Sequence, residues 1–317
     1  MPVMPVMPVM PAIPAIPAMP SQKQIPHSIS GVIPAMAVMS DAAHPHRAVP
    51  PAALAMIGGG QMALALAEGF CRAGLLKPSD ITVFDPHPAA KERLAARVPG
   101  IIFAEAGSQA AAAARIVFLA VKPQQAAAAC HDFAASLGAD AVVVSIVAGL
   151  TTHRLAELTG TRRIVRVMPN TPCLVGRGVS VICHTPDVPA ADAARVHELL
   201  AAVGRVHEAD ESLMDAVTGL SGSGPGFVAL VVEALADGGV KAGLPRPLAL
   251  ALATETLSGT AALLEQTGEH PAQIKDRVSS PGGTTIAGLA VLEQRGVRGA
   301  LIDAVVTAAA RARELGT

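Results

Sequence analysis

The chain has 317 residues, of which 51% are hydrophobic and 15% charged, and its formal net charge is −1. A chain without a basic excess does not resemble a nucleic-acid-binding protein, so we expect no nucleic-acid partner. The high apolar content predicts a sizeable core, and the scarcity of charge indicates that some apolar surface is buried against another subunit.

The first 51 residues differ in composition from the rest of the chain. Proline recurs at every third position from Pro2 to Pro20. Because proline lacks an amide donor, this apolar segment does not fit a membrane helix, and it also lacks the charged start and continuous apolar run of a signal peptide. We expect residues 1–51 to be a proline-rich, low-complexity tail in a polyproline-II or disordered state. We also expect a cytoplasmic protein without a membrane partner.

Short apolar runs alternate with helical segments between residues 52 and 210. Strands are predicted at 54–57, 81–84, 101–103, 116–121 and 142–147. The runs at 164–168, 179–183 and 205–207 can extend the same sheet, and helices are predicted at about 61–73, 91–96 and 190–203. Strands that alternate with helices predict an α/β fold with a parallel, doubly wound sheet, so we assign residues 52–210 to a Rossmann-like dinucleotide-binding domain.

Residues 211–317 show helical patterns and no further strand. The expected helices cover 225–242, 247–266, 284–294 and 297–315, with Gly243, Gly268 and Gly296 as C-terminal caps. The first of them is apolar around most of its circumference, and such a helix must be buried on all sides. We therefore predict an all-helical domain that buries its apolar faces in a homodimer or a larger homo-oligomer.

A glycine-rich turn follows the first predicted strand. The segment Gly58-Gly59-Gly60-Gln61-Met62-Ala63 fits the G-x-G-x-x-A pattern of dinucleotide-binding turns. Gly58 permits the tight turn, Gly60 lets the backbone approach a pyrophosphate, and Ala63 allows the helix to pack closely on the strand. A lone glycine pattern is a weak signal, but here the strand and helix around it also fit. We predict that these six residues bind NADPH or NADH.

Other candidate cofactor contacts lie at the ends of predicted strands, where ligands bind in open α/β sheets. Asp85 can accept hydrogen bonds from the adenosine ribose, which favours NAD, but it can equally be a helix cap, so both cofactors stay open. Three further strand ends supply Ala120, Val121, Lys122 and Pro123, then Ala148, and then Asn170. Proline and glycine at such places also serve as simple turn formers.

A second glycine-rich turn, at residues 279–285, opens a predicted helix. Successive amides at a helix N-terminus form an anion site, and the hydroxyls of Ser280, Thr284 and Thr285 can add donors. A bare helix cap would not need so many small residues. We therefore predict an anion-binding, substrate-binding turn that consists of Ser280, Gly282, Gly283, Thr284 and Thr285.

The four cysteines, Cys71, Cys130, Cys173 and Cys183, show no spacing typical of metal ligands. The ten histidines add no ligand pattern beside them. We therefore predict no metal site, and we interpret the cysteines as buried free thiols in a reducing compartment.

These motifs resemble the pyrroline-5-carboxylate reductase family over residues 52–315. The resemblance is carried by GGGQMA from Gly58, AVKPQ from Ala120, RVMPNTP from Arg166, DAVTGLSGSGP from Asp215, EALADGGVKAGLP from Glu233, HPAQIKDRVSSPGGTTIAGL from His270 and DAVVTAAARAREL from Asp303. The last three blocks are specific to this family, whereas the first is shared by many dehydrogenases. Gly107 and Gly268 depart from the pattern, because some members place polar side chains there towards the cofactor and the substrate.

The resemblance implies an enzyme that reduces 1-pyrroline-5-carboxylate to proline with hydride from NADPH or NADH, at a site between helical domains. It also implies that Thr285 forms the hydrogen bond to the ring nitrogen. A threonine hydroxyl is too weak an acid to supply the proton, so either the substrate arrives as the iminium or water delivers the proton. The alternatives are a hydroxy-acid dehydrogenase that uses Lys122, and a non-catalytic dinucleotide sensor, which would not need the second turn.

Overall fold

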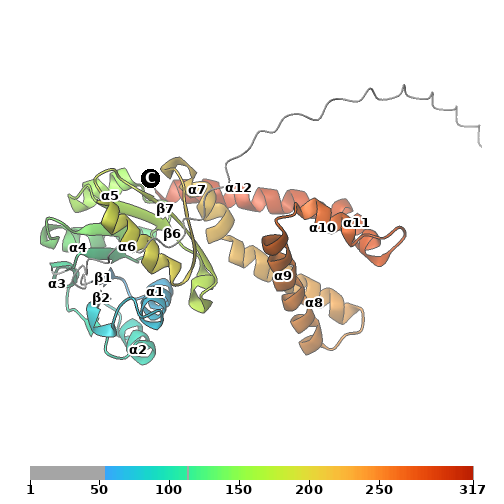
Figure 1. Cartoon of the computed structure of the whole chain (residues 1–317), viewed down its shortest axis with the longest axis horizontal. Coiled ribbons are helices and arrows are strands. Elements are labelled where there is room, and N and C mark those ends of the chain that lie inside the picture. Colours follow the sequence, from blue (N-terminus) through green and yellow to red (C-terminus); the bar gives the residue numbers. More distant parts are fainter. Residues whose placement is uncertain (1–53, 113, 317) are drawn as a thin grey trace, which may run out of the picture. The chain divides into compact units, whose positions relative to one another are not determined.

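The structure is a computed structural model that describes residues 54–112 and 114–316 (Figure 1). The predicted proline-rich tail at 1–51 lies outside these residues. The described chain begins directly at the first strand, β1, which spans Leu54–Ile57.

The first half of the described chain forms one eight-stranded sheet in the order β3-β2-β1-β4-β5-β6-β7-β8. β1 lies inside the sheet and pairs in parallel with β2 and β4. The order of the first six strands is that of the Rossmann fold, in which ligands bind where the strand order reverses beside β1. The other strands are β2 (Ile81–Phe84), β3 (Ile102–Phe103), β4 (Ile116–Leu119), β5 (Val142–Ser145), β6 (Ile164–Met168), β7 (Gly178–His184) and β8 (Gly204–Glu208).

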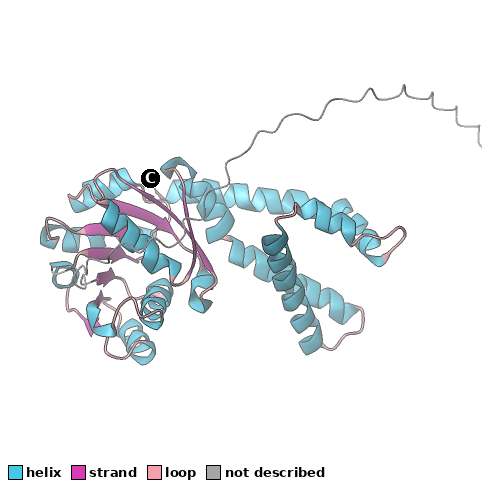
Figure 2. Cartoon of the chain, viewed as in Figure 1, coloured by secondary structure: helices cyan, strands magenta, loops and turns pink. Residues whose placement is uncertain are grey.

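Helices cover both faces of the sheet, as a doubly wound fold requires (Figure 2). Successive residues of β1 point to opposite faces, so Leu54 and Met56 join one core cluster while Ala55 and Ile57 join the other. The first cluster includes residues of α1 (Gln61–Arg72), α2 (Pro88–Arg97) and α6 (Ala190–Ala201). The second includes residues of α3 (Gly107–Ala112), α4 (Ala126–Phe133) and α5 (Thr152–Thr159).

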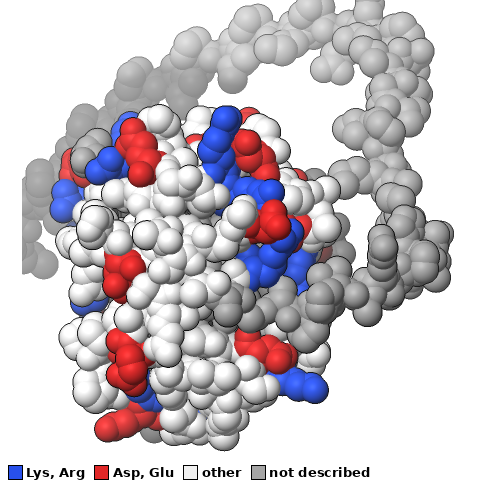
Figure 3. Space-filling view, turned by 90° about the vertical axis from the view of Figure 1, so that its left-hand side faces the viewer, with Lys and Arg blue, Asp and Glu red and all other residues white. Residues whose placement is uncertain are grey.

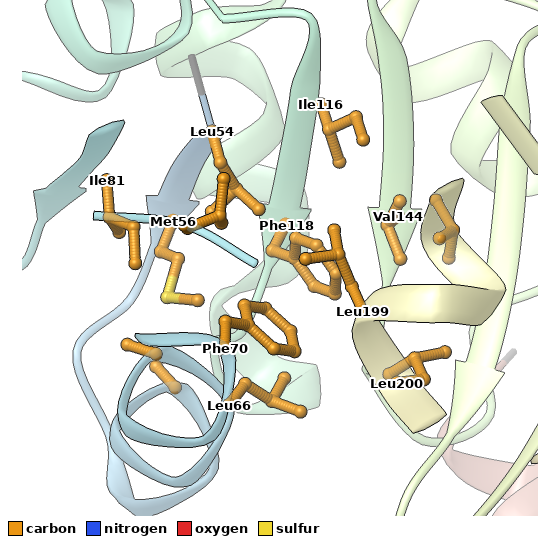
Figure 4. Close-up of a cluster of buried hydrophobic side chains, with 14 of the residues drawn as sticks. Leu54, Met56, Leu66, Phe70, Ile81, Ile116, Phe118, Val144, Leu199 and Leu200 are labelled. Atoms are coloured by element: carbon orange, nitrogen blue, oxygen red, sulfur yellow. The ribbon is translucent and has the colours of Figure 1, made fainter. Parts of the chain in front are cut away.

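The first cluster is centred on two aromatic rings (Figure 4). Phe70 from α1 and Phe118 from β4 are fully buried, and their ring centroids lie 5.9 Å apart. Leu199 of α6 belongs to the same cluster, so α1 and α6 are anchored to one face of the sheet. This packing fixes the glycine-rich turn between β1 and α1.

The pairing of β7 departs from the predicted parallel sheet, because β7 runs antiparallel to β6. Only a short 3₁₀ segment at Thr171–Val175 lies between them. A parallel pair needs a crossover of a dozen or more residues, and this connection is too short to supply one. β8 pairs with β7 in parallel after the α6 crossover. All pairs in the sheet other than β6 with β7 are therefore parallel.

Helices fill the second half, and no strand occurs among described residues beyond Glu208. They are α7 (Met214–Val217), a π-helical turn at Thr218–Gly222, α8 (Gly224–Lys241), α9 (Arg246–Thr267), α10 (Pro271–Arg277), α11 (Thr284–Gln294) and α12 (Val297–Leu315). α8 and α9 pack side by side, and α12 packs on the π-helical turn.

The helical region has almost no core of its own. Among its described residues, one small buried cluster consists of Ala236, Ala249 and Ala253. Large apolar side chains remain exposed along every long helix, among them Val228, Leu230, Leu248, Leu250, Leu252, Leu263, Ile286, Val291, Leu301 and Val306. Two stretches, Glu211–Lys241 and Arg246–Thr267, are long and apolar enough to cross a membrane by length and composition alone. Both a subunit interface and a membrane would supply the further apolar surface that these helices require.

Candidate functional site

A cavity of about 870 Å³ opens at the carboxyl ends of β1, β2 and β4. Its volume lies within the range of small-molecule and cofactor sites. Of the predicted cofactor residues, it is lined by Gly58, Gly60, Ala120, Val121 and Lys122. The fold therefore brings the glycine-rich turn and the end of β4 to one cavity, as the strand-end argument predicts.

Gly58 and Gly60 shape the floor of this cavity in different ways. Gly58 has φ +102°, and a Cβ there would lie 2.6 Å from the carbonyl oxygen of Ala120. A Cβ at Gly60 would meet no atom within 4 Å, so the backbone faces open space. Gly60 is also the N-cap of α1, and no side chain caps that helix. An exposed helix N-terminus with free amides fits the pyrophosphate of a dinucleotide.

Asp85 forms two hydrogen bonds with the backbone beside the cavity. Its Oδ2 accepts a hydrogen bond from the Gly59 amide at 2.7 Å, and its Oδ1 accepts one from the His87 amide at 2.8 Å. The side chain is buried. Both carboxylate oxygens therefore stabilise the backbone of the two turns beside the cavity. Asp85 also lines the cavity and has further lone pairs, so its contact with a ribose stays a prediction.

The remaining predicted cofactor residues do not line the cavity. Gly59 and Ala63 are buried behind it, and Gln61 and Met62 lie in the first turn of α1. Pro123 begins a 3₁₀ turn after β4, and Ala148 follows β5. These residues lie along the same sheet edge but outside the enclosed space.

Asn170 has a structural role that sequence analysis did not reveal. Its Oδ1 accepts a hydrogen bond from the Val179 amide at 2.8 Å, and its Nδ2 donates one to the Ser221 carbonyl oxygen at 3.2 Å. The side chain therefore ties the end of β6 to the start of β7 and to the π-helical turn. One N–H of Nδ2 and one lone pair of Oδ1 remain without a partner in the described residues, so the predicted cofactor contact of Asn170 stays a prediction.

The second glycine-rich turn is open to solvent in the protomer. Ser280, Gly282 and Thr284 are exposed, while Gly283 and Thr285 are half-buried. The Gly283 amide donates to the Ser280 carbonyl oxygen at 3.0 Å, which closes the turn. No side chain caps α11 at Gly283, so the amides at the start of α11, including that of Ile286, are the ones left for an anion. Ile286 was not among the predicted residues, because an apolar side chain gives no sign that its amide is free.

The side-chain hydroxyls of this turn are also free to form hydrogen bonds with a ligand. Within residues 54–112 and 114–316, the hydroxyls of Ser280, Thr284 and Thr285 have no hydrogen-bond partner. None of the turn's residues lines the cavity of the glycine-rich loop. The described protomer thus carries two separate polar features, one that fits a dinucleotide and one that fits a small anion.

The cysteines do not supply a reactive group. Burial raises the pKa of the Cys130 thiol to about 11, and burial chiefly raises that of Cys183 to about 11 as well. Burial also raises the pKa of Cys71 and Cys173. All four thiols are free and stay protonated near neutral pH, so they are poor nucleophiles. The residues that the structure describes contain no group of three metal-ligating side chains.

Arg93 is a cavity residue that sequence analysis missed. It lies in α2, lines the cavity, and donates from Nη2 to the Gly59 carbonyl oxygen at 3.4 Å. A single arginine in the charged run KER looks like part of a solvated helix face. Only the folded structure shows that the Arg93 side chain points towards the glycine-rich turn and the cavity.

Two family models match the chain. A model described as pyrroline-5-carboxylate reductase dimerisation matches residues 211–315, which contain the helices. A model described as NADP oxidoreductase, coenzyme F420-dependent, matches residues 53–149, which contain the glycine-rich turn and the first five strands. The sheet region and the helical region are thus similar to two different families of domains that occur together here.

Curated relatives and solved structures indicate the same enzyme family. A pyrroline-5-carboxylate reductase of Synechocystis is 46% identical over 83% of this chain and 98% of its own, and that of Pisum sativum is 44% identical over 83% and 95%. The Plasmodium falciparum enzyme, solved with NADP bound, has a TM-score of 0.78 at 32% identity, covering 84% of this chain and 98% of that one. The Coxiella burnetii enzyme has a TM-score of 0.76 at 31% identity, covering 84% and 100%. The chain belongs to the pyrroline-5-carboxylate reductase family.

Proposed function

We propose that the protein reduces 1-pyrroline-5-carboxylate to proline with hydride from NADPH or NADH, the last step of proline biosynthesis. The observation that carries this proposal is the 46% identity to the Synechocystis reductase over 98% of that enzyme's length. Both polar features described above lie within the matching region. A reaction of this kind needs a fixed hydride donor, an anchored substrate and an electrophilic imine carbon.

The sheet domain, residues 52–210, holds the dinucleotide. Gly58 to Ala63 present the N-terminus of α1 to the pyrophosphate, and Ala120 to Pro123 contact the cofactor from the end of β4. Ala148 and Asn170 lie further along the sheet edge, where we place contacts to the nicotinamide half through the backbone. When bound, the cofactor supplies the hydride. These residues fix its position and exclude solvent from one side of it.

The turn at 279–285 holds the substrate. The carboxylate of the substrate accepts hydrogen bonds from the backbone of Gly282 and Gly283 and from the amides that open α11 at Thr284. Ser280 adds a hydroxyl donor at the other side of the turn. These contacts use a helix N-terminus, which favours a negative charge.

Thr285 contacts the reacting group. Its hydroxyl has no other partner in the described chain and forms a hydrogen bond at the ring nitrogen. Because a threonine hydroxyl is a very weak acid, it orients the imine and does not supply the proton. The proton arrives with the substrate as the iminium, or through water. Thr285 is the catalytic residue of this proposal in the sense that it touches the reacting atoms.

The active form is a homodimer or a larger homo-oligomer, built by the helical domain at residues 211–317. Two observations support this: the helices expose large apolar side chains, and the substrate turn is open to solvent in the protomer. A second helical domain would cover the first and close the turn against a cofactor. The two helices that could span a membrane by composition lie within the region matched by the dimerisation model. We therefore assign their apolar faces to a subunit interface and place the protein in the cytoplasm.

We propose no nucleic-acid partner. Basic and acidic side chains are interspersed on the face in Figure 3, without a continuous basic area. The formal net charge of −1 agrees with this distribution. Binding to a phosphate backbone needs clustered lysine and arginine.

The decisive experiment is a coupled measurement of NADPH or NADH consumption and proline formation with purified protein and 1-pyrroline-5-carboxylate. We expect one proline for each cofactor oxidised. Oxidation of hydroxy acids with the oxidised cofactor tests the dehydrogenase alternative. Cofactor binding without any turnover would instead support the sensor and would contradict the proposed function.

A further inference from the structure

The α2 side of the cofactor cavity contains an arginine without a charged partner. Arg93 lines the cavity, and its only hydrogen bond within residues 54–112 and 114–316 is the 3.4 Å contact from Nη2 to the Gly59 carbonyl oxygen. Its Nε atom is buried and has no partner at all. A buried donor that lacks an acceptor costs free energy unless a ligand supplies one. The guanidinium is thus arranged for an acceptor that the protein does not provide.

Two of the carboxylates that line the cavity accept hydrogen bonds from backbone amides. Both oxygens of Asp85 accept hydrogen bonds from the amides of Gly59 and His87. Asp132, which also lines the cavity, accepts a hydrogen bond from the Gly107 amide at 2.8 Å. Neither of them, nor Glu105 in the same lining, forms an ion pair with Arg93, so its guanidinium has no carboxylate partner among the described residues.

The position of Arg93 indicates which part of a dinucleotide it would meet. The pyrophosphate lies at the start of α1, and the adenosine ribose lies at the end of β2. Arg93 reaches the Gly59 carbonyl from α2, which follows β2, and so lies on the ribose side of the turn. A guanidinium with several free donors matches a phosphate better than a neutral ribose hydroxyl.

We infer that Arg93 binds the 2′-phosphate of NADPH and makes the protein selective for NADPH over NADH. This inference rests on the dinucleotide-binding role proposed above. Asp85 lines the same cavity, with its carboxylate fixed by the amides of Gly59 and His87, so Arg93 is the group that offsets the repulsion between that carboxylate and a phosphate. Selectivity arises from one cation on α2, while the glycine-rich turn binds the pyrophosphate common to both cofactors.

Calorimetric titration with two cofactor fragments tests the inference without relying on turnover. We expect the wild-type protein to bind adenosine 2′,5′-bisphosphate about 10-fold or more tightly than adenosine 5′-monophosphate, since a hydrogen bond to a charged group contributes that much. Arg93→Met removes the charge and keeps most of the side-chain length. It should weaken the bisphosphate by about 10-fold or more and change the monophosphate by less than about twofold.

Arg97→Met is the matched control on the same helix. Arg97 is exposed and pairs with Glu68 at 2.8 Å, away from the cavity lining. This variant should change neither titration, because exposed ion pairs contribute little. In steady-state kinetics, the ratio of kcat/KM for NADPH to that for NADH should fall in Arg93→Met and stay unchanged in Arg97→Met.

The inference fails if Arg93→Met, folded by circular dichroism, binds the bisphosphate as the wild type does. It also fails if the wild-type protein binds both fragments equally, a measurement that does not depend on whether the variant folds. Absence of proline formation with either cofactor would refute the proposed function instead. The fragment titrations would then still decide the role of Arg93.

Discussion

At the residue scale, two glycines of one turn meet different requirements. Gly58 needs both its positive φ of +102° and the absence of a Cβ, because the Ala120 carbonyl oxygen lies where the Cβ would be. Gly60 faces open space, so its lack of a side chain serves a ligand and not the fold. The same residue type is therefore structural at one position and functional two residues later.

Substitution with alanine separates these two roles. Gly58→Ala should lower the free energy of unfolding by about 2 kcal/mol or more, because a left-handed backbone and a collision with Ala120 both oppose it. Gly60→Ala should leave the melting temperature nearly unchanged and weaken NADPH binding. Thermal unfolding and cofactor titration of both variants measure this difference. Equal loss of stability in the two variants would contradict the assignment of Gly60 to the cofactor.

The hydroxyl of Thr285 gives a second test at this scale. Thr285→Ala should lower kcat by about 10²-fold, the usual effect of removing one donor at a reacting group, with little change in NADPH affinity. Thr285→Ser keeps the hydroxyl and should recover most of the turnover. The measurements are kcat for both variants and NADPH titration by fluorescence. Normal turnover in Thr285→Ala would remove this residue from the mechanism.

Sequence alone predicts those residues whose backbone position follows from the fold. Gly58, Gly60 and Ala120 to Lys122 were expected at one cavity because strand ends meet at one edge, and they do line it. The directions of long polar side chains depend on tertiary contacts and were not predictable. Asp85 turns to two amides, Asn170 bridges β7 and the π-helical turn, and Arg93 reaches the cavity from α2.

At the scale of the element, strands were easier to predict than short helices. Most strands coincide with apolar runs, because a buried strand needs continuous apolar residues, whereas the edge strand β8 (Gly204–Glu208) is largely polar. α3, α4, α5, α7 and α10 were missed, since helices of four to eight residues are too short for an amphipathic pattern to repeat. The antiparallel direction of β7 follows from the short connection between β6 and β7. The composition of β7 does not determine that direction.

The proline-rich segment allows a test of where the folded unit begins. β1 starts at Leu54, and its neighbours in the sheet are β2 and β4, both far beyond the segment. Deletion of residues 1–50 should therefore leave the melting temperature and kcat/KM unchanged within error. Circular dichroism and the proline-formation assay compare the two proteins directly. Loss of solubility or activity on deletion would assign a structural role to the segment.

At the scale of the whole molecule, the two halves obtain their stability differently. The sheet domain buries two large clusters against its own helices, whereas the helical domain buries only three alanines in a cluster of its own. Leucines on several sides of α9 are exposed in the protomer. A helix that is apolar on all sides must be buried on all sides, so we expect other helices to surround α9 in the functional state. An obligate interface that covers such helices buries more than about 2,000 Å² and resembles a domain core.

A single charge at the predicted interface should separate association from folding of the sheet. Leu252 on α9 is 45% exposed, and Ile102 on the edge strand β3 is 46% exposed, so the two are matched in size and exposure. Leu252→Glu should place a charge in the interface, shift the oligomer towards monomer and lower kcat/KM, because a protomer of this kind has no complete substrate site. Ile102→Glu should change neither the oligomeric state nor kcat/KM.

Light scattering after size exclusion over a wide dilution range, with activity measured at each concentration, follows both properties. A compact, fully active monomer in the wild-type protein at low concentration would refute the shared site, whatever Leu252→Glu does.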